Sequence, residues 1–259
     1  MNPIKHPVET TVGNLEDTIR VLSYNIHKGF NPSNSRFILD EMRHAIRTVN
    51  AELVFLQEVT GNNEKQGKRH DNWIPEAQFE FLADQMWHHY AYGKNAIYQH
   101  GHHGNAILSK LPFEFWENTD VSQFKFSQRG ILQGVIKHGI HVFCLHLGLL
   151  GVERRTQIKM LIDTITKRVP LDAPLIIAGD FNDWNCSLDK RLKKSLNLRE
   201  AFSEARGKPA RTFPAAFPIF QLDRIYFRNL RLVDSSLLVD DHWQGLSDHC
   251  ALYAEFETP

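Results

Sequence analysis

The fold is decided by one stretch of the chain, Ala173-Pro174-Leu175-Ile176-Ile177-Ala178-Gly179-Asp180-Phe181-Asn182-Asp183. Its apolar run, 175–178, is typical of a strand that is buried on both faces. Residues two apart on a strand point to the same side, so an extended backbone reaching Asn182 would place its carboxamide beside the Asp180 carboxylate. A carboxylate can hold a metal or orient water, and an amide can donate to a phosphoryl oxygen. The stretch therefore indicates a phosphate site, although a strand followed by an ordinary polar turn also fits it.

Polar side chains accompany other apolar runs in the same way. In layered α/β folds, sites collect where strands end in polar groups. We therefore expect the polar residues of these runs to meet the Asp180 stretch in one site. They are Asn25 in the run 21–27, Glu58 in 53–59, His146 in 141–146, Asp223 in 222–227, and Asp248 with His249 in 246–249.

An ordered set of short motifs resembles the endonuclease/exonuclease/phosphatase family, the DNase-I-like metal-dependent phosphoesterases. Each motif is weak alone, but the ordered set is specific and extends over nearly all of 20–256. The likeness is to small bacterial stand-alone members. It implies a four-layer α/β/β/α sandwich, with two mixed β-sheets packed face to face and helices outside. The motifs are Tyr24-Asn25-Ile26, Leu56-Gln57-Glu58, Gly104-Asn105-Ala106-Ile107-Leu108-Ser109, His146-Leu147, Gly179-Asp180-Phe181-Asn182, Leu222-Asp223-Arg224-Ile225 and Ser247-Asp248-His249.

The resemblance also implies a metal centre. In the family a metal binds at the position that Glu58 occupies, and Asn25 and Asp248 match positions at or near the same ion. Oxygen ligands of this kind suit Mg²⁺ or Mn²⁺, the expected cofactor. Asn25 is also expected to contact the substrate.

Five further residues take catalytic roles by the same resemblance. The family pairs the positions of Asp223 and His249, so that the carboxylate fixes the tautomer of the imidazole. His146 matches a histidine that stabilises phosphate or protonates the leaving oxygen, and its orienting carboxylate is not evident from the sequence. Asp180 is expected to orient the water or the histidine, and Asn182 to contact a phosphoryl oxygen. Either His249 or Asp180 is the base.

Substrate contacts are expected from two residues and from several loops. Asn105 belongs to the family's Gly-Asn-Ala pattern, whose strand lines the cleft, and Arg129 stands where members often carry a basic residue. The polar segment 60–73 is predicted to be a loop that either attracts phosphate or is simply solvated. The histidines in 99–104 lack the spacing of a zinc site and predict a loop instead, which is a candidate for contacting substrate phosphate because it adjoins Asn105. The segment 206–218 mixes basic, aromatic and proline residues, so it either selects substrate or packs on the core.

Composition limits the class of protein. With 259 residues and 42% hydrophobic content, the chain can bury a sufficient core without disulfide bonds or structural metals. We expect one domain, 17–259, after a tail, 1–16. Thirty basic residues balance thirty acidic ones. Proteins that bind duplex DNA without sequence preference usually carry a net positive charge, so this balance makes DNA in general a less expected partner. The absence of a long apolar run, the lack of a signal-peptide pattern and the three unpaired cysteines favour a cytoplasmic protein without a transmembrane segment. We expect a monomer.

Hydrophobic periodicity predicts the remaining elements. Helices are expected at 38–49, 76–88, 151–169 and 188–196. Strands are expected at 17–27, 53–57, 89–96, 105–109, 131–137, 140–146 and 222–227, with a hairpin joining 131–137 to 140–146.

The sequence therefore predicts a metal-dependent phosphodiesterase in which water attacks phosphorus in line. Its substrate is a phosphate ester, with nucleic acid as one candidate and a lipid or small-molecule phosphodiester as the alternative. A binding module that kept the fold and lost the chemistry is the third interpretation.

Overall fold

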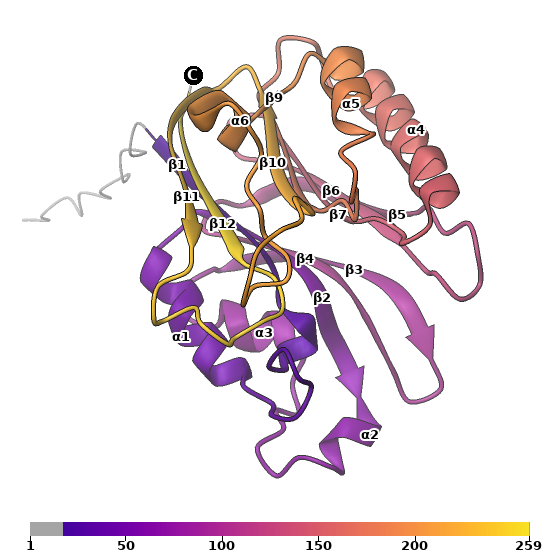
Figure 1. Cartoon of the computed structure of the whole chain (residues 1–259), viewed down its shortest axis with the longest axis vertical. Helices are drawn as coiled ribbons and strands as arrows, with labels where there is room; N and C mark the ends of the chain where they lie inside the picture. The colour runs from indigo at the N-terminus through magenta and orange to yellow at the C-terminus, as the bar shows by residue number, and fades with distance from the viewer. Residues whose placement is uncertain (1–17, 259) are drawn as a thin grey trace, which may run out of the picture.

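Two six-stranded mixed sheets lie face to face in a computed structural model that describes residues 18–258. Helices cover the outer faces, which confirms the predicted four-layer sandwich (Figure 1). The predicted tail, 1–16, lies outside the described residues. Within the described part of the chain, none of the helices has both the length and the apolar character needed to cross a membrane.

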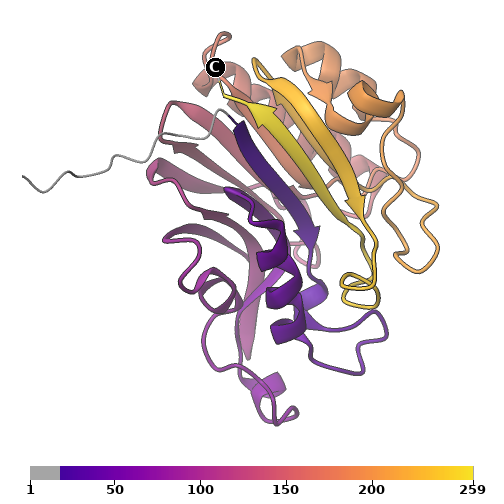
Figure 2. The same ribbon diagram turned by 90° about the vertical axis from the view of Figure 1, so that its left-hand side faces the viewer.

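The first sheet has the strand order β11-β12-β1-β2-β4-β3. Figure 2 shows α1 lying across its outer face, with β1 and β12, the first and last strands of the described residues, side by side. The elements of this half are β1 (Thr18–Asn25), the short 3₁₀ helix η1 (His27–Gly29), α1 (Leu39–Val49), β2 (Leu53–Asn63), α2 (Glu64–Gly67), α3 (Gln78–Ala83), β3 (His89–Tyr98), β4 (Gly101–Ser109), β11 (Arg231–Leu238) and β12 (Ala251–Glu257).

The second sheet has the order β5-β6-β7-β8-β10-β9, and its outer face carries α4 and α5 (Figure 1). Its elements are β5 (Phe113–Asp120), β6 (Gly130–Ile136), β7 (Ile140–His146), α4 (Gly151–Arg168), β8 (Leu175–Asp180), α5 (Asp189–Leu196), β9 (Arg199–Glu200), α6 (Ala201–Arg206) and β10 (Asp223–Arg228).

Strand alternation divides the core into three parts. On β1, Val21 faces the other sheet, whereas its neighbour Leu22 faces the layer under α1. On β8, Ile176 faces the first sheet, and Ile177 packs with Leu161 of α4. Burial on both faces explains why these strands read as continuous apolar runs, and it fixes their register because a slip by one residue would exchange the two faces.

The sheet topology brings the polar residues to one edge. β1 is parallel to β2, and β7 is parallel to β8, so Asn25, His146 and Asp180 lie at strand ends on the same edge. Glu58 was predicted to end its strand but lies within β2, at an irregularity in the pairing of β2 with β4, where its backbone φ is 57°. Asp223, in contrast, begins β10, and Asp248 and His249 precede β12, so the prediction that they end strands is wrong. They still reach the same edge because β10 is antiparallel to β8 and β12 is antiparallel to β1.

Several predicted loops and helices differ from the structure. The segment predicted as the loop 60–73 instead continues β2 to Asn63 and then forms α2, because β2 pairs with β4 as far as Gly101. Most of 99–104 likewise belongs to β4, and only a tight turn remains. The helix predicted at 76–88 ends at Ala83, where Asp84 leaves the helical region. The strands β5, β11 and β12 were not predicted.

Candidate active site

Asp180, the last residue of β8, is the centre of the polar edge and is 1% exposed. Its Oδ2 accepts from Asn25 Nδ2 at 3.2 Å, and its Oδ1 accepts from the backbone N–H of Asn182 at 2.9 Å. The same Oδ2 lies 3.4 Å from His146 Nε2 and 3.8 Å from His249 Nε2. One carboxylate therefore links four of the residues that the sequence predicted for the site.

His249 is held by a second carboxylate. Its Nδ1 lies 2.8 Å from Asp223 Oδ2, and both side chains are buried, so the predicted hydrogen bond is present. Burial lowers the pKa of His249, but the carboxylates of Asp223 and Asp180 raise it more, to about 10. At neutral pH the imidazole is therefore a cation between two carboxylates, with Nε2 directed toward Asp180.

His146 differs from His249 in its protonation state. It ends β7 in register with Asp180 on the adjacent parallel strand, which supplies the orienting carboxylate that the sequence did not reveal. Burial lowers the pKa of His146 to about 4; Asp180 opposes this shift and Arg129 adds to it. His146 is therefore neutral at pH 7.

This neutral histidine makes the folded chain sensitive to acid. The pKa of His146 is about 4 in the fold and 6.5 ordinarily, so the unfolded chain binds more protons between these pH values and stability falls as the pH falls. We expect His146 to lower the free energy of unfolding by about 2 kcal/mol from pH 7 to pH 5. Urea denaturation at both pH values checks this, because a His146→Gln protein should lose about 2 kcal/mol less than wild type. Equal losses would contradict the assignment.

Asn182 reaches the site by a route that differs from the prediction. The strand ends at Asp180, and the backbone of Asn182 is left-handed with φ 46°, so the extended geometry does not continue. Its Nδ2 donates to the Leu147 carbonyl at 2.9 Å, and its backbone N–H meets Asp180. The backbone N–H of Asn182 thus orients the Asp180 carboxylate, and its side chain holds the start of the following loop against the residue after β7.

The predicted metal ligands lie beside this group. Asn25 Nδ2 is 3.4 Å from Glu58 Oε1, and Lys28 forms an ion pair with Glu58 Oε2. Asp248 Oδ1 lies 3.1 Å from His27 Nδ1. Burial raises the pKa of Glu58, but Lys28, His146 and His27 together hold it well below its usual range, so Glu58 is ionised.

This donor set fits a hard divalent cation. The oxygens of Glu58, Asn25 and Asp248 are ligands that Mg²⁺ and Mn²⁺ accept, and the charge of Glu58 acts on Asp248 directly. A second group, Asp180, Asp223 and His249, has ligand atoms within 4.8 Å of one another. There the imidazole is hydrogen-bonded to Asp223, lies 3.8 Å from Asp180 and is cationic, which opposes a metal. Glu58 is therefore the better anchor.

A recess lined by Glu58, His103 and His146 contains Asn105 and Arg129, two of the three residues predicted to bind substrate. Asn105 donates to the Gly130 carbonyl at 3.2 Å. Arg129 donates through Nε to the Leu147 carbonyl at 3.2 Å, and its charge acts on His146. His103 comes from the histidine-bearing segment that was predicted as a candidate contact for substrate phosphate, and burial lowers its pKa to about 4.

The predicted loops divide between the site and the rest of the fold. From 206–218, Phe213 packs on the His249 ring with centroids 4.9 Å apart. Its basic residues line another pocket with Phe202 and Leu237. From the segment 60–73, Trp73 packs against Phe37 in the core under α1, with ring centroids 4.5 Å apart.

Two residues near the site were missed by sequence reasoning. Trp184 packs edge-on against Phe213, with centroids 5.8 Å apart, and extends the aromatic wall beside His249. Lys28 follows the β1 motif closely, and its position after a strand end was the available signal.

Known proteins are similar to this chain along most of its length. The uncharacterised protein YbhP of Escherichia coli (strain K12) is 46% identical over 243 residues, which are 92% of this chain and 96% of YbhP. YbhP of Shigella flexneri gives the same values.

Solved structures share the fold at lower identity. A family protein from Leptotrichia buccalis superposes with a TM-score of 0.70 at 17% identity, over 93% of this chain and 100% of that one. D. rerio TDP2 complexed with a single-strand DNA product gives a TM-score of 0.68 at 17% identity, over 94% and 100%. The profile of the Endonuclease/Exonuclease/phosphatase family matches residues 22–249, nearly the whole described chain. The chain belongs to the endonuclease/exonuclease/phosphatase family.

Proposed function

We propose that the chain is a divalent-metal-dependent phosphodiesterase that hydrolyses its substrate by in-line attack of water. The observation that carries the proposal is Asp180 Oδ2 between a neutral His146 and a cationic His249, beside the oxygen ligands of Glu58 and Asn25. Family membership supports phosphoester hydrolysis in general.

The chain's own residues account for the proton and charge movements. A water between Asp180 Oδ2 and His249 Nε2, which lie 3.8 Å apart, would be oriented by both. Its proton passes to Asp180 Oδ2, because His249 is already protonated, and Asp223 keeps the imidazole in place. His146 and Arg129 line one recess with Glu58, where they would stabilise phosphoryl oxygens. A cation held by Glu58, Asn25 and Asp248 would supply charge neutralisation on the phosphate.

A substrate panel tests the function. The purified protein with Mg²⁺ or Mn²⁺ is assayed on DNA, RNA, nucleotides, phosphoinositides and sphingomyelin. We expect metal-dependent hydrolysis of at least one of these phosphoesters. A folded protein that binds the metals and hydrolyses none of them would instead support the binding-module interpretation.

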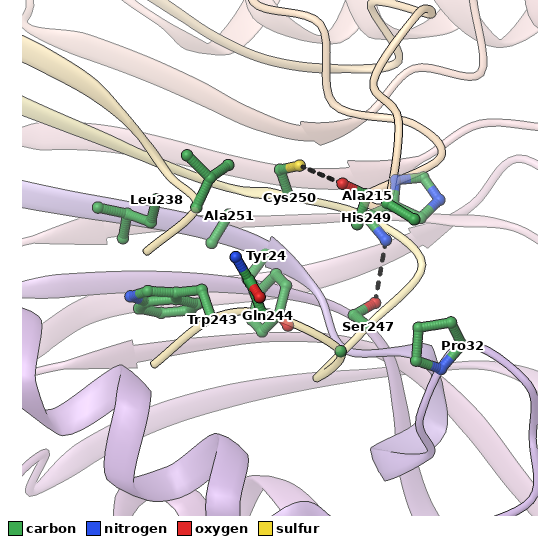
Figure 3. Close-up of a pocket in the computed structure, with 13 residues that line it drawn as sticks. Tyr24, Pro32, Ala215, Leu238, Trp243, Gln244, Ser247, His249, Cys250 and Ala251 are labelled. Atoms are coloured by element: carbon green, nitrogen blue, oxygen red, sulfur yellow. Dashed lines mark hydrogen bonds between the residues drawn. The ribbon is translucent and has the colours of Figure 1, made fainter. Parts of the chain in front are cut away.

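A pocket next to His249 favours a lipid or small-molecule phosphodiester as the second candidate substrate. Its volume is about 360 Å³, and it lies between the loop after β11 and the segment near Ala215 (Figure 3). Tyr24, Leu238 and Trp243 supply its apolar wall. Among the described residues that line it, none is a Lys, Arg, Asp or Glu. Apart from His249, which belongs to the catalytic group, a polyanionic backbone finds no cation there, whereas a neutral apolar substituent can be buried.

Filling this pocket separates the two substrate classes. Val239→Trp places a bulky ring at the pocket, and we expect it to raise KM for a small apolar phosphodiester about tenfold, equivalent to 1.4 kcal/mol. Val233→Trp is the matched control, because Val233 is 47% exposed and Val239 is 48% exposed, and only Val239 lines the pocket. Unchanged KM in both variants would remove the support for this candidate.

A further inference from the structure

We propose that Lys28 is an internal cation that competes with the metal for Glu58 and thereby sets the metal affinity of the site. The inference rests on the proposed function, in which Glu58 is a metal ligand.

The contact itself defines the competition. Lys28 Nζ meets Glu58 Oε2, while the other carboxylate oxygen, Oε1, faces Asn25 Nδ2 at 3.4 Å. Both carboxylate oxygens of Glu58 therefore already contact a group of the chain, one an ammonium and the other an amide N–H. A divalent cation that binds this carboxylate must share it with the ammonium or displace it.

The backbone holds Lys28 in this position. Lys28 and Glu58 are both left-handed with φ 57°, and His27 has φ 46°, a conformation that is unfavourable for residues other than glycine. Gln78 Nε2 donates to the Lys28 carbonyl at 2.7 Å, and Gly29 N–H donates to the Ile26 carbonyl at 2.8 Å. A lysine that only solvated a surface loop would need no such fixation, so the backbone conformation points to a positioned side chain.

The surrounding charges make an internal cation necessary. Glu58 and Asp248 act on each other as like charges, and the side chain of Glu58 is only 17% exposed. A buried carboxylate without a partner is destabilising, and Lys28 removes that penalty. The Lys28 side chain is 39% exposed, so its ammonium group can move into solvent when it leaves Glu58. Two cations at one carboxylate repel each other, and metal binding therefore releases the ammonium.

Calorimetric titration with Mn²⁺ tests the inference without an activity assay. Lys28→Met should bind Mn²⁺ about tenfold more tightly than wild type, because the competing charge is gone. Its melting temperature in EDTA should fall, because Glu58 loses its partner. Lys110→Met is the matched control: Lys110 pairs with Glu52 at 3.1 Å with side-chain exposures of 26% and 16%. It should lower the melting temperature and leave the Mn²⁺ affinity unchanged.

Two further variants complete the test. Lys28→Arg keeps the charge and should bind Mn²⁺ no more tightly than wild type, since a guanidinium holds a carboxylate at least as well. Glu58→Gln should lose Mn²⁺ binding. Wild-type or weaker affinity in Lys28→Met, or tighter binding in Lys28→Arg, overturns the role of Lys28 while Glu58→Gln still reports the metal site. Wild-type affinity in Glu58→Gln overturns the metal ligand itself, and with it the proposed function.

Discussion

Replacement of His249 by glutamine is expected to lower kcat/KM for a phosphodiester by about 10³-fold. His249 Nε2 is the ring nitrogen that faces Asp180, and Nδ1 is held by Asp223 at 2.8 Å. Glutamine fills similar space and can donate a hydrogen bond, but it cannot carry the positive charge of the imidazolium. Initial rates with bis(p-nitrophenyl) phosphate in Mn²⁺ measure the effect, with circular dichroism as the check on folding.

The matched control is His44→Gln on α1, whose side chain is 73% exposed and far from the polar edge. It should hydrolyse the diester at the wild-type rate. A folded His249→Gln protein with wild-type kcat/KM would show that the imidazole takes no part in the reaction. A loss of similar size in both variants would point to a general effect of histidine replacement.

Replacement of Asp183 by alanine is expected to destabilise the fold by about 3–5 kcal/mol, because it leaves the Arg224 guanidinium buried without its carboxylate. Both side chains are 0% exposed, and the ion pair is 3.3 Å long. Asp183 also accepts from the backbone N–H groups of Ser187, at 3.1 Å, and Leu188, at 3.0 Å. The carboxylate therefore ties the loop after Asp180 both to β10 and to the start of α5.

Urea denaturation measures this loss, and Glu117→Ala provides the comparison. Glu117 pairs with Arg168 at the surface, where the side chains are 41% and 50% exposed. Such a pair is worth less than about 1 kcal/mol, so Glu117→Ala should change the free energy of unfolding only slightly. Equal losses in the two variants would mean that the buried pair does not stabilise the loop beside Asp180.

The positions of Asn25, Glu58 and Asp180 could be predicted because each stands where a doubly buried apolar run stops. Such runs identify central strands, and parallel strands that start and stop together leave their polar residues at one edge. Asp223 and His249 were predicted to lie at the same edge, but from the wrong end of their strands. Apolar patterning does not record strand direction, and only the antiparallel pairing with β8 and β1 corrects it.

Other features depend on information that local patterning lacks. The contact of His146 with Asp180 follows from the register of β7 on β8, which joins residues far apart in sequence. The left-handed turn at Asn182 fits the alternative of a polar turn after the strand, because asparagine adopts this backbone conformation more readily than most residues, but the pattern alone did not decide between the turn and a continued strand. The strands β5 and β11 lie at sheet edges and keep many exposed positions, so their apolar signal is weak.

The central claim is that Glu58 and its neighbours bind a cation that the Asp180–His249 pair needs for hydrolysis. Its most direct test compares wild-type and Glu58→Gln proteins on bis(p-nitrophenyl) phosphate, each with Mn²⁺ and with EDTA. We expect wild type with Mn²⁺ to hydrolyse the diester, and EDTA or the Glu58→Gln substitution to remove that activity. Undiminished hydrolysis by wild type in EDTA, or by Glu58→Gln in Mn²⁺, would contradict the account.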